Sequence, residues 1–334
     1  MKVLRLHAAG DLRFHEEALP TPQPGHSLVQ IGAVGICGSD LHWFDEAGIG
    51  DARISRPLVL GHEMAGWTED GQLVAIDPAI PCGKCEYCLE GNPNLCPAHH
   101  FAGHGADDGS LREYMVWPDH CLFPLPDGFT PADGAMLEPL GVALYSVDLS
   151  GIRPGDTVGV FGCGPIGLMI VQLARVAGAS HIIATDLLPH RVEAAQASGA
   201  DLAFLAEAGR EVEQIRSALN GKPVDVVIEA AGTNAAIETA LQLVKPGGKV
   251  TLVGIPSEDE TRITASLVRR KGLALQWVRR MKHTYPRTIE LVHRGQVDVR
   301  ALISHTFPFE QADQAFRSAQ SREGLKVVVS MAKK

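Results

Sequence analysis

The stretch that decides the fold is DTVGVFGCGPIGLMIVQLARVAGA, residues 156–179. It begins with an apolar run that is typical of a buried strand and continues through a glycine-rich turn. The segment PIGLMIVQLARVAGA that follows, residues 165–179, has the length of a helix rather than of a strand, and the helix ends at Gly178. The stretch therefore predicts a strand, a tight turn and a helix in immediate succession.

The same alternation continues towards residue 255. Further strand patterns are HIIATD (residues 181–186), VDVVIEAAG (224–232) and GKVTLVGI (248–255). Further helical patterns are HRVEAAQASGA (190–200) and NAAIETALQLVKPGG (234–248). Strands that alternate with helices at this spacing predict an α/β fold with a doubly wound parallel sheet of the Rossmann type.

The turn GCGPIG matches the G-x-G-x-x-G pattern of dinucleotide-binding sites. Gly162 permits the tight turn, Gly164 lets the backbone approach a pyrophosphate, and Gly167 allows the helix to pack closely on the strand. The N-terminus of the helix favours the anion. Pro165 and Ile166 complete the turn and belong to the predicted site.

Asp186 closes the next predicted strand, about 20 residues after Gly167. Its carboxylate would accept hydrogen bonds from the adenosine ribose hydroxyls, and its charge would repel the additional phosphate of NADP. Arg191 lies nearby in the sequence and slightly weakens that preference. We therefore expect NAD as the cofactor.

The remainder of the chain has a different texture. Residues 1–140 show short alternating or apolar runs separated by Gly and Pro, which predicts a mostly β region with long loops. The β texture returns in ALISHTFPF, residues 301–309. The simplest organisation is a dinucleotide-binding domain, residues 141–279, inserted into a β-rich domain formed by residues 1–140 and 280–334.

Composition narrows the range of partners. The formal net charge of −9 opposes binding to a nucleic-acid backbone. Residues 157–174 carry no charge, but four glycines and Pro165 favour strand, turn and helix over a membrane span. The N-terminal residues lack the long apolar core of a secretory signal. We therefore expect a cytoplasmic protein, whose clustered cysteines bind metal rather than form disulfides.

The segment CGKCEYCLEGNPNLC, residues 82–96, concentrates four cysteines. They are Cys82, Cys85, Cys88 and Cys96. Four thiolates satisfy tetrahedral zinc and leave no position for water or substrate, so the segment predicts a structural zinc lobe. Lys84 is offset by Glu86 and Glu90, so the lobe lacks the basic face of a nucleic-acid module.

A catalytic zinc needs three protein ligands and an open position. Two segments upstream of the cysteine lobe supply candidate ligands and acid–base groups, GICGSDLH at residues 35–42 and GHE at residues 61–63. The candidates are Cys37, Ser39, Asp40, His42, His62 and Glu63. A single cysteine or histidine is more often an ordinary core or surface residue, so these pairs alone leave the assignment open.

In order and approximate spacing, five motifs resemble those of the zinc-dependent medium-chain dehydrogenases. They are GICGSDLH, PLVLGHE, the four-cysteine lobe, EPLGVALYS at residues 138–146, and GCGPIG. The similarity covers essentially the whole chain. It is greatest to the polyol branch, the sorbitol/xylitol and L-idonate 5-dehydrogenases, because Glu follows "GH" and because EPL stands where alcohol dehydrogenases place a cysteine ligand.

The resemblance implies a GroES-like fold for the β-rich catalytic domain and a ligand set for the catalytic zinc. Cys37 and His62 match residues that bind the catalytic zinc directly, and Glu63 matches the carboxylate ligand of polyol dehydrogenases. Glu138 matches a second glutamate that binds the metal either directly or through a water. Asp40 matches the residue that holds the tautomer of the histidine ligand.

The remaining matched positions concern proton transfer and substrate. Ser39 and His42 match a relay that carries the alcohol proton towards solvent. Arg280 matches an arginine near the zinc water and the substrate, although the adjacent Arg279 could take that place. The resemblance thus implies two zinc ions per chain, one catalytic and one structural, and a homo-oligomer, as a tetramer before a dimer.

The implied reaction is transfer of a hydride from a secondary alcohol of a polyol or sugar acid to NAD⁺. Two alternatives remain open: an L-threonine or 2,3-butanediol type dehydrogenase of the same superfamily, and a catalytically inactive zinc-stabilised binding protein. No membrane or nucleic-acid partner is expected.

The sequence departs from the family pattern after Glu63, where residues 64–73 are shorter than usual. Trp43 also stands where many sorbitol dehydrogenases have a tyrosine in the substrate cleft. His99, His100 and His104 form either a polar surface loop or part of the substrate cleft.

Overall fold

A computed structural model describes residues 1–50, 52–207, 209–256 and 260–332. The chain forms two compact units. One, here called the β-rich unit, consists of Met1–Pro139 and Tyr285–Lys334, and the other, the α/β unit, consists of Leu140–Thr284. Among the described residues no helix is long and apolar enough to cross a membrane.

The second boundary follows Thr284 rather than residue 279. Gly141 shows why, because a Cβ there would overlap the Met281 sulfur, so the chain just before the boundary packs inside the α/β unit. Tyr285 instead stacks on Phe123 with ring centroids 4.5 Å apart, inside the β-rich unit. Arg280, expected at the start of the returning segment, therefore lies in the α/β unit.

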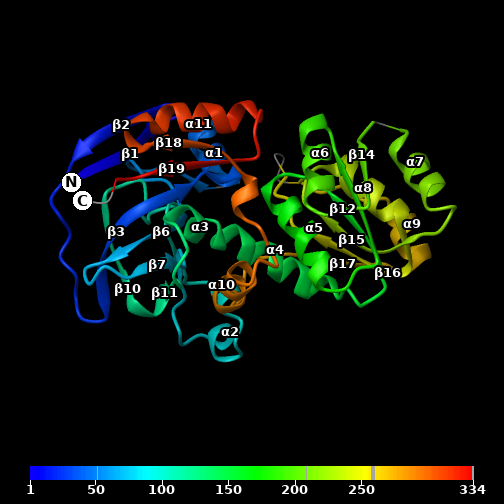
Figure 1. Cartoon of the computed structure of the whole chain (residues 1–334), viewed down its shortest axis with the longest axis horizontal. Helices are drawn as coiled ribbons and strands as arrows, with labels where there is room; N and C mark the ends of the chain where they lie inside the picture. Colours follow the sequence, from blue (N-terminus) through cyan, green and yellow to red (C-terminus); the bar gives the residue numbers. More distant parts are fainter. Residues whose placement is uncertain (51, 208, 257–259, 333–334) are drawn as a thin grey trace. The chain divides into compact units, whose positions relative to one another are not determined.

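The main sheet of the β-rich unit has seven strands in the described part of the chain, in the order β11-β7-β6-β3-β19-β18, with β10 also paired to β3. Their bounds are β3 His26–Gly35, β6 Glu63–Thr68, β7 Leu73–Ile76, β10 Tyr114–Pro118, β11 Leu122–Pro124, β18 Ile303–Pro308 and β19 Lys326–Ser330. Figure 1 shows the C-terminal strand β19, in red, beside the blue strand β3. The two ends of the chain thus complete one sheet.

Shorter elements surround this sheet. The strands are β1 Lys2–Ala8, β2 Asp11–Glu16, β4 Gly48–Ile49, β5 Ala52–Arg53, β8 Ala79–Ile80 and β9 His100–Phe101. The α-helices are α1 Gly38–Glu46, α2 Glu86–Leu89, α3 Pro131–Ala135, α10 Tyr285–His293 and α11 Ala312–Ser321, and α4 Leu137–Ser150 continues into the α/β unit. The short 3-10 helices are η1 Pro93–Leu95, η2 Asp119–Cys121, η3 Arg300–Leu302 and η4 Phe309–Gln311. The core beneath them includes Trp43, Phe44 and Phe316, all fully buried.

The shortened segment after Glu63 forms a tight hairpin between β6 and β7. Thr68 donates its backbone N–H to the carbonyl of Gln72 at 3.0 Å, and Gly71 donates to the carbonyl of Thr68 at 2.9 Å. Gly71 has a φ of +84°, in the left-handed region that glycine tolerates. The missing residues therefore shorten a turn while the two strands remain paired.

In its described residues the α/β unit has a six-stranded parallel sheet in the order β14-β13-β12-β15-β16-β17. The strands are β12 Thr157–Phe161, β13 His181–Asp186, β14 Leu202–Leu205, β15 Val224–Glu229, β16 Val244–Leu252 and β17 Ala274–Trp277. The helices are α5 Pro165–Val176, α6 Pro189–Ala197, α7 Glu211–Ala218, α8 Asn234–Leu243 and α9 Ala265–Lys271, drawn from green to orange in Figure 1. The predicted α/β fold class is confirmed.

Candidate functional site

The sheet of the β-rich unit brings three candidate ligands together. In the register of the sheet Glu63 on β6 lies opposite Gly35 on β3, and Gly35 lies opposite Val328 on β19. Cys37 lies two residues after the end of β3 and His62 directly precedes β6, so strand pairing places both near Glu63. The Cys37 sulfur, a ring nitrogen of His62 and a carboxylate oxygen of Glu63 all lie within 4.8 Å of one another.

Asp40 orients two sides of this cluster from the first turn of α1. Its Oδ2 accepts the backbone N–H of Cys37 at 3.0 Å, and its Oδ1 accepts that of Gly61 at 3.2 Å. The same Oδ1 lies 3.4 Å from Nδ1 of His62. Because Nδ1 faces the carboxylate, Nε2 is left as the nitrogen for a metal.

Burial would by itself raise the pKa of Asp40 and lower that of His62. The interaction with His62 and the backbone N–H groups of Cys37 and Gly61 lower the pKa of Asp40, and the interactions with Asp40 and with the Cys37 side chain raise the pKa of His62 well above its ordinary value. Both side chains are almost completely buried. Asp40 is therefore a carboxylate that remains ionised and holds the imidazole.

A residue that sequence reasoning missed completes the cluster. Lys326, at the start of β19, is 3% exposed, and its Nζ donates to Oε1 of Glu63 at 2.6 Å and also pairs with Oε2. Burial alone would lower the pKa of Lys326, but the Glu63 carboxylate and the neighbouring Cys37 raise it. A Cβ on Gly35 would overlap Oε2 of Glu63, so glycine makes room for this pair. The signal in the sequence was a single lysine in an otherwise apolar strand.

Cysteine, histidine and carboxylate at these separations fit zinc, which accepts sulfur, nitrogen and oxygen ligands. Three protein ligands would leave a fourth position open, as catalytic zinc sites do. Glu138, in the first turn of α4, is 5% exposed, but it is not one of the three side chains in the cluster. The structure thus brings Glu63 to Cys37 and His62, and it places Glu138 outside that group.

The predicted relay residues lie on one helix. Ser39 and His42 are three residues apart on α1, a spacing that places them on the same side. Ser39 is half-buried, and the His42 side chain is 28% exposed, with Nδ1 3.6 Å from a carboxylate oxygen of Glu46. Both side chains of the pair are therefore partly exposed.

Aromatic rings connect the cluster to the loop after the cysteine lobe. The Phe101 ring packs against His62 at 5.3 Å and against His104 at 6.3 Å. His104 accepts the indole N–H of Trp43 at 3.3 Å. Trp43 is 1% exposed, so its added bulk is accommodated in the core.

The other two histidines of that loop have different surroundings. Nδ1 of His99 lies 2.8 Å from the Cys96 carbonyl oxygen, and the His100 side chain, 68% exposed, pairs with Asp107 at 3.0 Å. Among the three, His104 is the one that contacts Trp43 and the ring next to His62.

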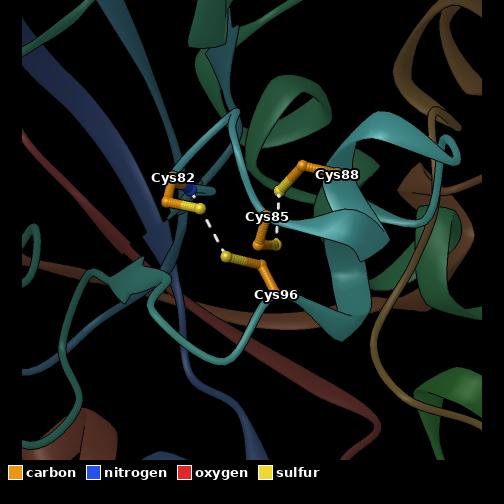
Figure 2. Close-up of side chains that lie close together, drawn as sticks. All are labelled: Cys82, Cys85, Cys88 and Cys96. Carbon is orange, nitrogen blue, oxygen red and sulfur yellow. Dashed lines mark hydrogen bonds between the residues drawn. The ribbon is translucent and has the colours of Figure 1, made fainter.

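The four-cysteine lobe is built by α2, η1 and the loops around them (Figure 2). All four sulfur atoms lie within 4.8 Å of one another, with Cys85 and Cys88 sulfurs 3.4 Å apart. Zinc–sulfur bonds of about 2.3 Å place tetrahedral ligands about 3.8 Å apart, so the arrangement fits one zinc ion. Backbone N–H groups of Lys84 and Cys85 lower the pKa of Cys82 to about 6, which favours its thiolate.

The glycine turn after β12 has the shape that a dinucleotide needs. Gly162 has a φ of +97°, and a Cβ on Gly167 would overlap the Gly162 carbonyl. Gly164 caps α5, and Pro165 occupies its first position, where the missing N–H costs nothing. Ile166 follows in the first turn, half-buried. The N-terminus of α5 therefore presents its backbone to an anion.

Asp186 closes β13 next to that turn. Its Oδ2 accepts the backbone N–H of Cys163 at 2.7 Å, and its Oδ1 accepts that of Leu188 at 2.9 Å. Nη1 of Arg191 lies 3.7 Å from the position of a Cβ on Gly164. Burial, aided by Asp186, raises the pKa of Cys163 to about 12, so this thiol stays protonated and is not a nucleophile.

The two candidate arginines lie in the α/β unit, after β17. Arg279 is exposed and Arg280 is half-buried, with a φ of +56° that is uncommon for a side-chain-bearing residue. Burial and the adjacent Arg280 lower the pKa of Arg279. The metal cluster belongs to the β-rich unit, so the role of Arg280 remains a prediction.

Comparison with known proteins identifies the family. Residues 23–127 match the alcohol dehydrogenase GroES-like domain, and residues 165–294 match the zinc-binding dehydrogenase domain. The chain is 35% identical to sorbitol dehydrogenase of Bacillus subtilis, with 98% of this chain and 97% of that protein covered.

Solved structures give the same result. An oxidoreductase of unknown specificity from Escherichia coli superposes with a TM-score of 0.94 at 28% identity, covering 99% of each chain. L-idonate 5-dehydrogenase from Escherichia coli superposes with a TM-score of 0.91 at 27% identity, covering 98% of this chain and 97% of that one. The chain therefore belongs to the zinc-dependent medium-chain dehydrogenases, in the polyol branch that includes the sorbitol dehydrogenases.

Proposed function

We propose that the protein is an NAD-dependent, zinc-dependent dehydrogenase that oxidises a secondary alcohol of a polyol or sugar acid. The observation that carries the proposal is the cluster of Cys37, His62 and Glu63, whose ligand atoms lie within 4.8 Å of one another. The glycine turn and Asp186 of the α/β unit supply a cofactor site in the same chain.

In this proposal the thiolate of Cys37, Nε2 of His62 and the carboxylate of Glu63 hold the catalytic zinc. Zinc, when bound, supplies a Lewis acid that makes the hydroxyl of an alcohol easier to deprotonate. Asp40 keeps the His62 ring in the tautomer that a metal requires. Glu138 remains a candidate for a second carboxylate that acts through a water or by exchange with Glu63.

Lys326 would compete with the metal for the Glu63 carboxylate. The carboxylate pairs with the buried ammonium, and the same oxygens are the ones that a metal would bind. A carboxylate shared in this way can approach or leave the metal without ever being buried as an uncompensated charge. We propose that Lys326 would compensate the charge of the Glu63 carboxylate both when that carboxylate holds the metal and when it does not.

The proton from the substrate hydroxyl needs a route to water. Ser39 and His42 supply one, because they share a side of α1 and His42 is partly exposed. The His42 ring can accept a proton on one nitrogen and release one from the other. Replacement of His42 by Ala should lower turnover when the concentration of the buffer is low. Turnover should recover as the buffer concentration rises.

The hydride acceptor is the nicotinamide of NAD, whose redox chemistry belongs to the cofactor. Asp186 favours NAD over NADP, since its charge repels a phosphate on the adenosine ribose. Arg280 is proposed to contact substrate.

From the family resemblance we also propose that the protein is cytoplasmic and forms a homo-oligomer. A tetramer is expected in preference to a dimer, and light scattering would test this.

A combined assay tests the proposed function. Purified protein is analysed for zinc and is incubated with NAD or NADP and a panel of alditols, aldonates, short diols and L-threonine. We expect about two zinc ions per chain and NADH formation with a polyol or an aldonate. Oxidation of only 2,3-butanediol or L-threonine would move the substrate to that alternative. One zinc per chain with no alcohol oxidised would support an inactive binding protein.

A further inference from the structure

The carboxyl edge of the parallel sheet holds a buried acid that the proposed mechanism does not use. Glu229 is the last residue of β15, and its side chain is fully buried. β15 lies beside β12 in the middle of the sheet, where the strand order changes direction. Ligands of doubly wound sheets bind outside the carboxyl ends of the strands at such a point.

Glu229 holds the loop that follows its own strand. Its Oε1 accepts the backbone N–H of Ala231 at 2.9 Å and that of Gly232 at 2.6 Å. Gly232 has a φ of +69°, a conformation that glycine adopts without strain. Because two successive backbone N–H groups bond to the same oxygen, one side chain fixes the shape of the loop.

The loop held by Glu229 packs directly on the glycine turn. A Cβ on Gly162 would lie 2.5 Å from the backbone nitrogen of Ala231 and 2.7 Å from the carbonyl carbon of Ala230. Ala230 also donates its N–H to the carbonyl of Phe161, the last residue of β12, at 2.7 Å. A shift of residues 230–232 would therefore displace the turn that approaches the pyrophosphate.

The other side of the loop is equally close to the chain after β16. A Cβ on Gly254 would overlap the backbone nitrogen of Gly232, and a Cβ on Gly232 would overlap the carbonyl of Ile255. Val253 donates its N–H to the carbonyl of Glu229 at 2.8 Å. The loop is thus confined between the ends of β12 and β16, and Glu229 is the side chain that fixes it.

Stability alone does not account for an acid at this position. Among the described residues Oε2 of Glu229 has no hydrogen-bond partner, although it is buried. Burial, opposed by the backbone N–H groups of the loop, raises the pKa of this carboxyl. A buried polar atom without a partner is costly, which points to a role in shaping the loop.

We propose that Glu229 is a positioning residue for the dinucleotide, which keeps Ala231 and Gly232 against the Gly162 turn in the form that binds NAD. The inference rests on the proposed function, because NAD is the ligand assigned to that turn. Glu229 itself touches no reacting atom in this account. It acts through the backbone of residues 230–232.

The chain offers a matched control on the same strand. Asp225 lies near the amino end of β15, where its Oδ2 accepts the backbone N–H of Thr157 at 2.9 Å and its Oδ1 pairs with Lys245 at 2.7 Å. It also fixes a backbone N–H with a carboxylate, but at the edge opposite to the glycine turn. The variant D225N therefore reports general destabilisation of the sheet.

The experiment measures the Kd of NADH by fluorescence, the KM values for NAD and for the polyol, and the zinc content. In E229A we expect the Kd of NADH and the KM for NAD to rise by about tenfold, because two backbone hydrogen bonds are lost. Zinc content and the KM for the polyol should stay within about twofold of wild type. E229Q keeps an acceptor for Ala231 and Gly232, so its Kd should stay within about threefold.

Two results would overturn the inference: E229A that binds NADH as tightly as wild type, or D225N that loses as much affinity as E229A at an equal loss of Tm. If E229A does not fold, E229D replaces it, because the shorter side chain cannot reach both N–H groups. E229D with the wild-type Kd would then contradict the inference. A wild-type protein that binds no NADH would instead refute the proposed function.

Discussion

The described residues of the β-rich unit contain two clusters of side chains that could hold a metal ion, and the two clusters are assembled in opposite ways. The four cysteines come from one segment of fifteen residues and are held by local turns. Cys37, His62 and Glu63 come from two segments and are united by the pairing of β3 with β6, while Lys326 arrives on β19 from 263 residues away. The local cluster has four like ligands and is closed, whereas the assembled cluster has three unlike ligands and is open.

The difference between the clusters indicates how the same metal can have a structural and a catalytic role in one chain. In the lobe, metal binding replaces a core that so short a segment cannot form. At the assembled cluster the ligands lie on or next to paired strands of a large sheet, and Asp40 and Lys326 hold two of them. Zinc should therefore stabilise the first cluster and activate substrate at the second.

The largest expected effect on turnover is that of Cys37→Ser. Removal of a ligand should lower kcat by at least about 10³-fold, because a metal contributes several kcal/mol of transition-state stabilisation. Tm should change by less than about 4 °C, equivalent to roughly 1 kcal/mol in a domain of this size. Zinc analysis and calorimetry check both values. Turnover that survives in C37S would show that the assembled cluster is not the catalytic one.

Asp40→Asn should have the next largest effect. The amide cannot hold His62 through a negative charge, and loss of such an orienting carboxylate typically costs 10–100-fold in metal affinity or activity, so we expect about that loss here. Zinc affinity is measured by competition with a chelator. Asp45→Asn, on the exposed part of the same helix, is the control and should leave both values unchanged. Equal zinc affinity in D40N and wild type would argue that Asp40 is only a helix cap.

Lys326→Met should separate the metal-free protein from the loaded one. Without zinc, Glu63 becomes a buried charge with no cation, which should lower the free energy of unfolding by about 3–5 kcal/mol. With zinc bound the loss should be much smaller, and zinc should dissociate more slowly because the ammonium no longer competes for Glu63. Denaturant titrations with and without zinc measure the difference.

Lys245→Met is the matched control for that experiment. Lys245 also pairs with a carboxylate, that of Asp225, but its side chain is 43% exposed, so the loss should be at most about 1 kcal/mol with or without zinc. If K326M destabilised both forms equally, the Lys326–Glu63 pair would be structural and would not compete with the metal.

The smallest expected effect on turnover is that of Cys85→Ser in the lobe. The fourth ligand of that zinc is lost, and because structural zinc contributes directly to folding, Tm should fall by more than about 5 °C. The kcat of the protein that remains folded should stay within about threefold of wild type, since the closed cluster never meets substrate. A collapse of kcat at unchanged Tm would reverse the roles of the two clusters.

The same comparison explains how much the sequence could predict. The lobe could be predicted because its four cysteines lie close together in the sequence. The α/β unit could be predicted because its strands and helices alternate along the chain. Cys37 and His62 were candidates whose assignment the sequence pattern left open until a family resemblance supported it, since their proximity depends on a strand pairing. Which glutamate joins them was left open, and the structure places Glu63 in that group.

Two residues could not be derived from local patterns. Lys326 joins the cluster because Val328 on β19 pairs with Gly35 on β3, a long-range register that no short motif encodes. Glu229 ends an ordinary buried strand, and its two bonds to Ala231 and Gly232 depend on the glycine-lined space between β12 and β16. In both cases the available signal was a charged residue at the end of a strand that is otherwise mostly apolar.

The most direct test of the central claim is a titration that removes zinc stepwise with a chelator while zinc per chain, NADH formation and Tm are followed on the same samples. The account predicts that the first zinc leaves the open cluster, so activity reaches zero when about one zinc per chain remains and Tm is still near its starting value. Activity that persists after the first zinc has gone, or Tm that falls in proportion to that first loss, would contradict the account.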